Sequence, residues 1–179
     1  MTGTAPTDGA PTDPTAPDCY TCAQEARYPE LPPRERIALD AHWRVAHAVG
    51  TALPGWVVLV PRRHVTAVHE LTDAEAAALG HWQVRLSRAL RAETGCAKTY
   101  VVQFAEAEGF SHVHFHLVPR MPDQPAEYRG PAVFGLLRRP AEERVTDVAA
   151  DALAGRLGAR LAADGPAAPG GAAGQSSGS

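Results

Sequence analysis

Residues 111–119 read Ser-His-Val-His-Phe-His-Leu-Val-Pro, a stretch with a histidine at every second position from 112 to 116. Imidazole and apolar side chains alternate along it, and in a β-strand alternate side chains share one face. The pattern predicts a strand with His112, His114 and His116 on a face that opens to a cleft or solvent, and with apolar side chains on the core face. Imidazole gains little from burial unless its nitrogens are paired, so three of them on an apolar strand favour chemistry over packing. Two chemistries fit: a metal site, or phosphate chemistry with one histidine as nucleophile and the others as hydrogen-bond donors.

Short strands are expected before this stretch. Residues 56–60 read Trp-Val-Val-Leu-Val after a Pro-Gly turn signal, which predicts a central strand buried on both faces. Residues 36–39 and 43–49 predict two further strands around a polar turn. A strand over 100–104 and a polar loop lead into the histidine stretch. Most of the sheet is therefore expected to be antiparallel.

Two helices are expected to cover this sheet. Thr72 and Glu75 have the spacing of a capping box, apolar residues follow at intervals of three and four, and Gly95 is placed to end the helix. A second helix is expected over 141–162. Strands lie on both sides of one long helix instead of alternating with helices, so the fold class is predicted to be α+β, an antiparallel-rich sheet with helices packed on one face.

The length and composition predict one domain. The chain has 179 residues, 45% of them hydrophobic and 21% charged. Apart from Met1, residues 1–17 and 165–179 contain nothing large and apolar to bury and are expected to be disordered tails around a domain at 18–164. The net charge of −3 argues against nucleic-acid or anionic-membrane partners. With no apolar stretch long enough to span a membrane and no signal-peptide pattern, a cytoplasmic location is expected.

Cys19 and Cys22 form a C-x-x-C pair, whereas Cys96 stands alone and is expected to be a small buried residue. In a reducing compartment such a pair is metal-binding or redox-active. A redox pair belongs at the start of a helix within a strand–helix–strand unit, and this pair instead follows the N-terminal tail. Its position favours zinc.

The motifs together resemble the histidine triad superfamily of nucleotide hydrolases and transferases. The run H-V-H-F-H-L-V is similar to the signature His-φ-His-φ-His-φ-φ, and residues 54–64, PGWVVLVPRRH, resemble the family pattern P-G-H-x-L-V-I-P-K-x-H. His69-Glu70-Leu71-Thr72 resembles the x-E-L-T helix entry, and the resemblance covers about residues 18–122. It implies a histidine-triad-like antiparallel sheet. It also implies a homodimer formed through the long helix and an adjacent strand, where Trp82 and Tyr100 are either interface or core aromatics.

The resemblance also implies residue roles. His114 matches the nucleophile that attacks the α-phosphorus and forms a nucleotidyl-histidine, and His116 matches a residue that binds phosphate oxygens and helps the leaving group depart. His116 is the third histidine of the triad, and the uridylyltransferase branch of the family has Gln at that position. The resemblance is therefore closer to the hydrolase branches. Gln103 stands where many members have a phosphate-site Asn, and Ser111 lies close to the family's phosphate-binding Ser.

Some branches of the family bind structural zinc through a C-x-x-C pair, a histidine after the central strand and the first histidine of the triad. Cys19, Cys22, His64 and His112 supply that set here. Two thiolates and two imidazoles form a closed tetrahedral site, the pattern of a structural zinc.

Two departures from the family concern the substrate. Residues 46–49, Ala-His-Ala-Val, lack the acidic residue that holds the ribose in many members. Glu106 and Glu108 lie in the loop before the triad. They either point to solvent or select a cationic or amine leaving group.

The expected activity is that of a nucleotide hydrolase that releases a nucleoside monophosphate from a dinucleoside polyphosphate or a nucleoside phosphoramidate. The alternatives are a nucleotidyltransferase with an acceptor other than water, and a nucleotide-binding module with negligible turnover.

Overall fold

The computed structural model describes residues 19–165, so the expected disordered tails lie outside the described residues except for Gly165. The strands and α-helices of this part are β1 (Ala38–Leu39), β2 (Trp43–His47), β3 (Val57–Pro61), β4 (Lys98–Val102), β5 (Phe115–Arg120), α1 (Tyr20–Ala26), α2 (Asp73–Thr94) and α3 (Asp147–Ala163). The longest of the short 3-10 segments is η5 (Gly130–Leu137). No helix in this part of the chain is long and apolar enough to cross a membrane.

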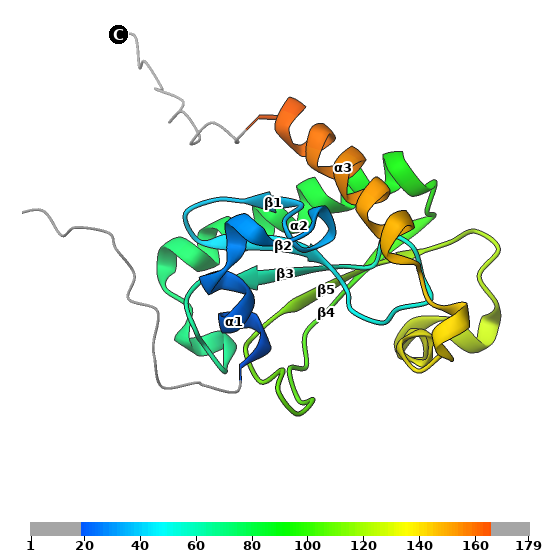
Figure 1. The fold of residues 1–179 in the computed structure, drawn as a ribbon, viewed down its shortest axis with the longest axis horizontal. Coiled ribbons are helices and arrows are strands. Elements are labelled where there is room, and N and C mark those ends of the chain that lie inside the picture. The colour runs from blue at the N-terminus through cyan, green and yellow to red at the C-terminus, as the bar shows by residue number, and fades with distance from the viewer. Residues whose placement is uncertain (1–18, 166–179) are drawn as a thin grey trace, which may run out of the picture.

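The strands form one antiparallel sheet in the order β1-β2-β3-β5-β4 (Figure 1). The apolar run at 56–60 supplies the middle strand, and four of the five β3 residues are buried. The prediction of a central, doubly covered strand is confirmed. The β4 strand closes one edge of the sheet and pairs only with β5.

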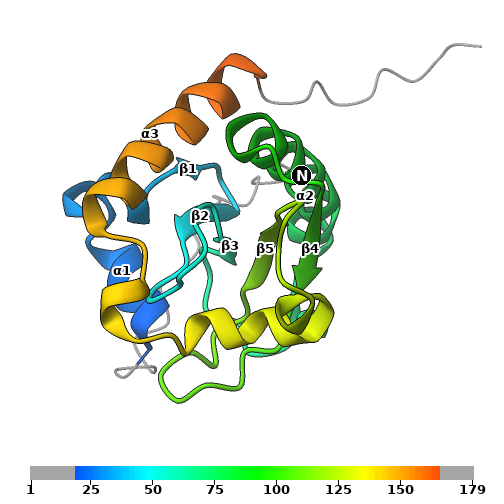
Figure 2. The same ribbon diagram turned by 90° about the vertical axis from the view of Figure 1, so that its right-hand side faces the viewer.

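Both long helices pack on one face of the sheet, as the α+β prediction requires (Figure 2). Trp82, Leu86 and Leu90 of α2 join Leu153 and Leu157 of α3 in one apolar cluster. The sheet residues of this cluster are Trp43, Val45, Val57, Leu59, Phe115 and Leu117. Trp82 is only 4% exposed, so it is a core residue.

The opposite face carries α1 and η5, neither of which was predicted (Figure 2). Val133 of η5 is fully buried in a second cluster with Trp56 and Val118, and Tyr100 packs against that cluster. The Tyr100 hydroxyl also accepts a hydrogen bond from the Gly130 backbone N–H at 3.1 Å. Both aromatic residues considered for a dimer interface are therefore used within the chain.

The predicted boundaries of α2 are confirmed. The Thr72 hydroxyl accepts from the Glu75 N–H at 3.2 Å, and the Glu75 carboxylate accepts from the Thr72 N–H at 2.7 Å. Gly95 ends the helix with φ +71°, a left-handed conformation that glycine adopts without steric cost.

Several predicted boundaries are wrong. The strand expected over 36–39 is β1 at Ala38–Leu39, and the strand expected over 100–104 is β4 at Lys98–Val102. The last helix begins at Asp147 after the cap residue Thr146, and residues 141–143 form only a 3-10 turn. The histidine strand begins at Phe115, not at Ser111. Pro61 ends β3 and has no N–H for a further ladder bond, and the chain before β5 instead bonds Val65 O through the Val113 N–H at 2.8 Å.

Candidate functional site

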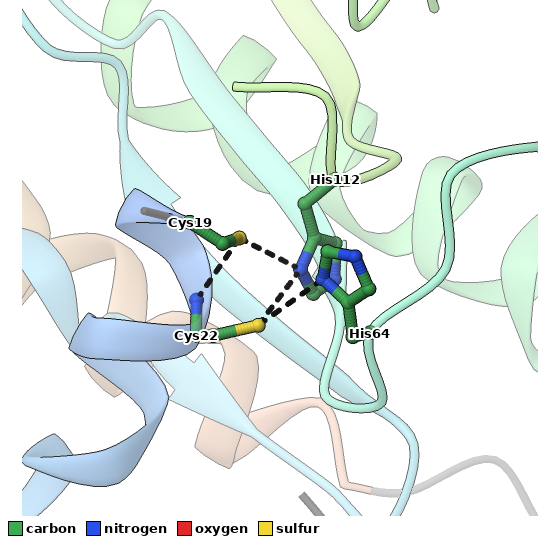
Figure 3. A group of neighbouring side chains, drawn as sticks. All are labelled: Cys19, Cys22, His64 and His112. Atoms are coloured by element: carbon green, nitrogen blue, oxygen red, sulfur yellow. Dashed lines mark hydrogen bonds between the residues drawn. The ribbon is translucent and has the colours of Figure 1, made fainter. Parts of the chain in front are cut away.

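Four potential metal ligands come together from three separate segments. Cys19 is the N-cap of α1 and Cys22 lies in its first turn, where the Cys22 N–H donates to the Cys19 Sγ at 3.5 Å. His64 follows β3 and His112 precedes β5. The ligand atoms of all four lie within 4.8 Å of one another (Figure 3). The structure thus assembles the set that the resemblance implied.

The distances in this cluster suit a tetrahedral ion. Each cysteine Sγ lies 3.6 Å from His112 Nδ1, and the Cys22 Sγ lies 3.2 Å from His64 Nδ1. Zinc bonds of about 2.3 Å to sulfur and about 2.0 Å to nitrogen place the two ligand atoms roughly 3.5 Å apart. His112 Nε2 donates to the Pro61 carbonyl at 2.9 Å, which directs Nδ1 toward the sulfurs. The donor set and its spacing fit a structural zinc site.

A buried ionic cluster holds the cysteine helix on the sheet. Arg44 of β2 is 2% exposed, and its guanidinium lies 3.4 Å from the Glu25 carboxylate of α1 and 3.8 Å from that of Glu35. The Tyr20 hydroxyl donates to Glu35 at 3.2 Å. Burial and the neighbouring Glu35 charge raise the pKa of Tyr20 to about 12, so it stays a neutral donor.

The three triad histidines do not share one environment. His112 is fully buried, His116 is 8% exposed and His114 is half-buried. The expectation that all three imidazoles face a cleft or solvent is therefore wrong for His112, because its ring turns into the cysteine cluster. His114 and His116 lie edge to face, with ring centroids 4.7 Å apart.

The backbone sets the tautomer of His114. Its Nδ1 lies 2.9 Å from the carbonyl oxygen of His112. A carbonyl only accepts, so Nδ1 carries the hydrogen and Nε2 keeps its lone pair. The same residue, His112, thus contributes its side chain to the cysteine cluster and its carbonyl to His114. In its neutral form, the middle histidine presents a nucleophilic nitrogen.

The tautomer of His116 is set by Trp56. The indole Nε1 lies 3.0 Å from His116 Nδ1, and both side chains are buried. An indole N–H only donates, so His116 Nδ1 accepts and Nε2 carries the hydrogen. Burial, together with the neighbouring His114, lowers the pKa of His116 to about 3, and the ring is neutral at physiological pH.

Trp56 and Phe134 are site residues that sequence reasoning missed. The Phe134 ring of η5 contacts His116 at 5.1 Å and Trp56 at 5.3 Å, and Phe104 contacts Phe134 at 5.3 Å. Trp56 was visible as a departure, because it occupies the position of the histidine in the pattern P-G-H. Nothing in the local sequence around Phe134 indicates that it meets a triad residue.

The predicted substrate-binding residues lie beside the triad. Gln103 directly follows Val102, which pairs with His116 across the ladder, and Ser111 adjoins His112. Neither side chain has a hydrogen-bond partner within residues 19–165. Ala48, within the stretch 46–49 that lacks the family's acidic residue, is buried in the apolar cluster of Trp56.

Comparisons with known proteins agree with this arrangement. The HIT domain model matches residues 32–123, slightly more than half of the chain. No curated protein matches the sequence. A zinc-bound histidine triad family protein from Mycobacterium smegmatis is 18% identical, with a TM-score of 0.58 over 82% of this chain and 96% of that one. A hypothetical histidine triad nucleotide-binding protein from Sulfolobus tokodaii is 13% identical, with a TM-score of 0.62 over 81% and 93%.

A histidine triad protein from Bradyrhizobium japonicum is 22% identical, with a TM-score of 0.59 over 76% of this chain and 95% of that one. At these identities the structural likenesses show the fold, and they confirm the predicted α+β class with its antiparallel sheet. The match of the domain model over residues 32–123 goes further and shows the family. The chain belongs to the histidine triad, or HIT, family.

Proposed function

We propose that this protein is a nucleotide hydrolase that cleaves at the α-phosphate through a covalent nucleotidyl intermediate on His114. The observation that carries the proposal is the bond from His114 Nδ1 to the His112 carbonyl, which leaves Nε2 free to attack. A nucleotide is the substrate class suggested by the family, and the Sulfolobus relative is described as nucleotide-binding.

The reaction divides into two displacements. The Nε2 lone pair of His114 attacks the α-phosphorus, the bond to the leaving group breaks, and the leaving group keeps that electron pair. Water then attacks the phosphorus, the phosphorus–nitrogen bond breaks, and its electron pair returns to Nε2. The water proton passes to solvent and a nucleoside monophosphate is released. His116 Nε2–H donates to a phosphate oxygen where negative charge gathers.

The proposed binding groups for the phosphates are Gln103 and Ser111. Both follow or precede an ordered strand next to the triad, and both have polar side chains without a protein partner within residues 19–165. An amide N–H and a hydroxyl each donate to phosphate oxygens without adding charge.

Zinc is the proposed metal of the four-residue cluster at Cys19, Cys22, His64 and His112. All four protein ligands are present, so a bound zinc would have no open position and would stabilise the fold instead of taking part in the reaction. Cys19, Cys22 and Cys96 form no disulfide within residues 19–165, which is the state that a reducing compartment maintains, and a cytoplasmic location is part of this proposal.

A homodimer through β4 and α2 is also proposed. The β4 strand is an edge, and an edge strand offers unpaired backbone groups to another chain. Val101 of β4 is 43% exposed and Val84 of α2 is 49% exposed, and both line one shallow hollow of about 390 Å³.

The decisive experiment is single-turnover labelling. Adenosine and guanosine substrates labelled at the α-phosphate are expected to leave acid-labile, base-stable label on the wild type and none on His114→Ala. His81→Ala, which changes an exposed histidine on α2, serves as the matched control and is expected to behave as the wild type. Turnover by His114→Ala would refute the mechanism. Label without release of the monophosphate would support the transferase alternative, and binding without label would support the binding module.

A further inference from the structure

The bond between Trp56 and His116 constrains what His116 can do in the reaction. Trp56 is fully buried, and its Nε1–H points at His116 Nδ1 over 3.0 Å. To become an imidazolium, His116 would have to carry a hydrogen on Nδ1 as well as on Nε2. That hydrogen would face the indole N–H, so protonation would replace a hydrogen bond with two opposed donors.

The surroundings of His116 offer no compensation for a positive charge. Its ring is enclosed edge to face by Trp56, Phe134 and His114 at centroid distances of 5.6, 5.1 and 4.7 Å. His114 is the one titratable group among these contacts, and a charge on it would disfavour a second charge on His116. No carboxylate in residues 19–165 forms an ion pair or hydrogen bond with His116.

The free nitrogen of this ring nevertheless remains available. His116 Nε2 has no protein partner within residues 19–165 and is not among the fully buried unpaired polar atoms of that range. In its fixed tautomer this atom is an N–H donor. A neutral imidazole N–H donates a hydrogen bond but is a far weaker acid than imidazolium, so it does not transfer its proton to a departing group.

We propose that Trp56 holds His116 as a permanently neutral hydrogen-bond donor and that the enzyme is therefore specific for leaving groups that depart as stable oxyanions. This inference rests on the proposed hydrolase function and names its substrate class: phosphoanhydrides, and not phosphoramidates. Trp56 acts through His116 and is a positioning residue.

The chemistry of the first displacement explains the selectivity. When a phosphoanhydride bond breaks, the leaving oxygen keeps the electron pair as part of a phosphate anion, which needs no proton at that moment. When a phosphorus–nitrogen bond breaks, the leaving nitrogen must gain a proton, because an amide anion is too basic to depart. His116 supplies a hydrogen bond to the first leaving group and no proton to the second. Glu106 and Glu108, which the sequence offered as selectors of an amine leaving group, are both exposed and form no ion pair within the described part.

The first test uses the wild-type protein and substrates that share one nucleoside. Their leaving groups are a nucleotide, a graded series of substituted phenols, and an amine. We expect kcat/KM to fall steeply as the phenol becomes more basic. We expect the amine substrate to react at least about 10²-fold more slowly than the nucleotide anhydride, the scale of a missing general acid. An amine substrate that reacts within tenfold of the anhydride would overturn the proposal while leaving the hydrolase function intact. Absence of turnover with every member, including the most activated phenyl ester, would instead refute the hydrolase function.

The second test measures the protonation state of His116 without any turnover. Long-range proton–nitrogen NMR of protein labelled in its imidazole nitrogens is expected to show the Nε2–H tautomer, unchanged between about pH 5 and pH 8. Titration of His116 within that range, or an Nδ1–H tautomer, would overturn the proposal.

Variants at Trp56 complete the design. Trp56→His places a ring nitrogen that can accept a hydrogen from His116 Nδ1, and it is expected to raise the amine-to-anhydride ratio of kcat/KM by at least tenfold. Trp82→Phe removes an equivalent indole donor, which bonds Asp40 on the other face, and it is expected to leave the ratio unchanged. A folded Trp56→His protein with the wild-type ratio contradicts the role of Trp56. If that variant does not fold, the substrate series and the NMR measurement still decide the proposal.

Discussion

Replacing Arg44 with Met should release the cysteine helix from the sheet. Arg44 is 2% exposed, and its two carboxylate partners, Glu25 and Glu35, have side chains only 8% and 12% exposed. Methionine fills much of the same volume but leaves Glu35 buried without its guanidinium partner, whereas Glu25 keeps its contact with Arg62. Removing one member of a buried ion pair costs about 3–5 kcal/mol of unfolding free energy.

The contact distances predict that Arg44→Met loses an unfolding free energy at the lower end of the range of about 3–5 kcal/mol. The contacts of 3.4 and 3.8 Å are longer than ideal charge-assisted hydrogen bonds, and neither Arg44 Nε nor Glu25 Oε2 has a proper hydrogen-bond partner. A loss of about 3 kcal/mol corresponds to a fall in Tm of roughly 6–12 °C for a domain of this size. The matched control is Arg62→Met, because Arg62 binds the same Glu25 at 2.6 Å but is 39% exposed. Surface pairs of this kind contribute only about 0–1 kcal/mol.

The pH dependence gives this prediction a second signature. Burial already raises the pKa of Glu35 against the opposing effect of Arg44. Without Arg44 that folded-state pKa rises further above the unfolded value, so the folded variant binds a proton that the unfolded chain does not. Stability gained in this way is present at low pH and is lost as pH rises through the folded-state pKa. The deficit of Arg44→Met relative to wild type should therefore be smaller at pH 6 than at pH 8.

Urea unfolding followed by circular dichroism, in excess zinc at both pH values, measures these differences. A loss below about 1 kcal/mol for Arg44→Met, or a loss equal to that of Arg62→Met, would refute the reasoning that burial makes the first pair essential.

Three further predictions concern the metal, the catalytic face and the dimer. Elemental analysis should find one zinc per chain, and a chelator should lower the Tm of the wild type but have little further effect on Cys22→Ser; zinc-free wild-type protein would contradict the site. Because the pKa of His116 is lowered to about 3, its unfolded form takes up a proton first as pH falls, so the stability it contributes is present above about pH 6.5 and is lost below it. Between pH 7.5 and pH 5 wild type should lose about 2 kcal/mol more than His116→Gln in urea unfolding, and equal losses would show that His116 is not held neutral. Val101→Lys should halve the mass found by light scattering whereas Val148→Lys, at an 80% exposed position on α3, should not; a monomeric wild type would exclude the dimer.

Several features followed from the sequence alone because neighbouring residues determine them. The start and stop of α2 depend on Thr72, Glu75 and Gly95, which act within one helical turn of each end. The apolar run at 56–60 supplies the middle strand, observed at Val57–Pro61, because it can be buried on both faces. The residues of the cysteine–histidine cluster were found from a motif match, and the structure then brought them within 4.8 Å.

Other features depended on contacts between residues far apart in the chain. The histidine strand begins at Phe115 because its partner strand β3 ends at Pro61. No pattern within residues 111–119 indicates where β3 ends. The tautomer of His116 depends on Trp56, 60 residues earlier, and the enclosure of its ring depends on Phe134, which follows it in a separate segment. The alternation and periodicity of apolar residues along the sequence indicate which face of a strand or helix a side chain occupies, because that depends on local backbone geometry. They do not indicate which residue packs against that face, because tertiary packing decides it, and here that residue, Trp56, determines which nitrogen of His116 carries the hydrogen.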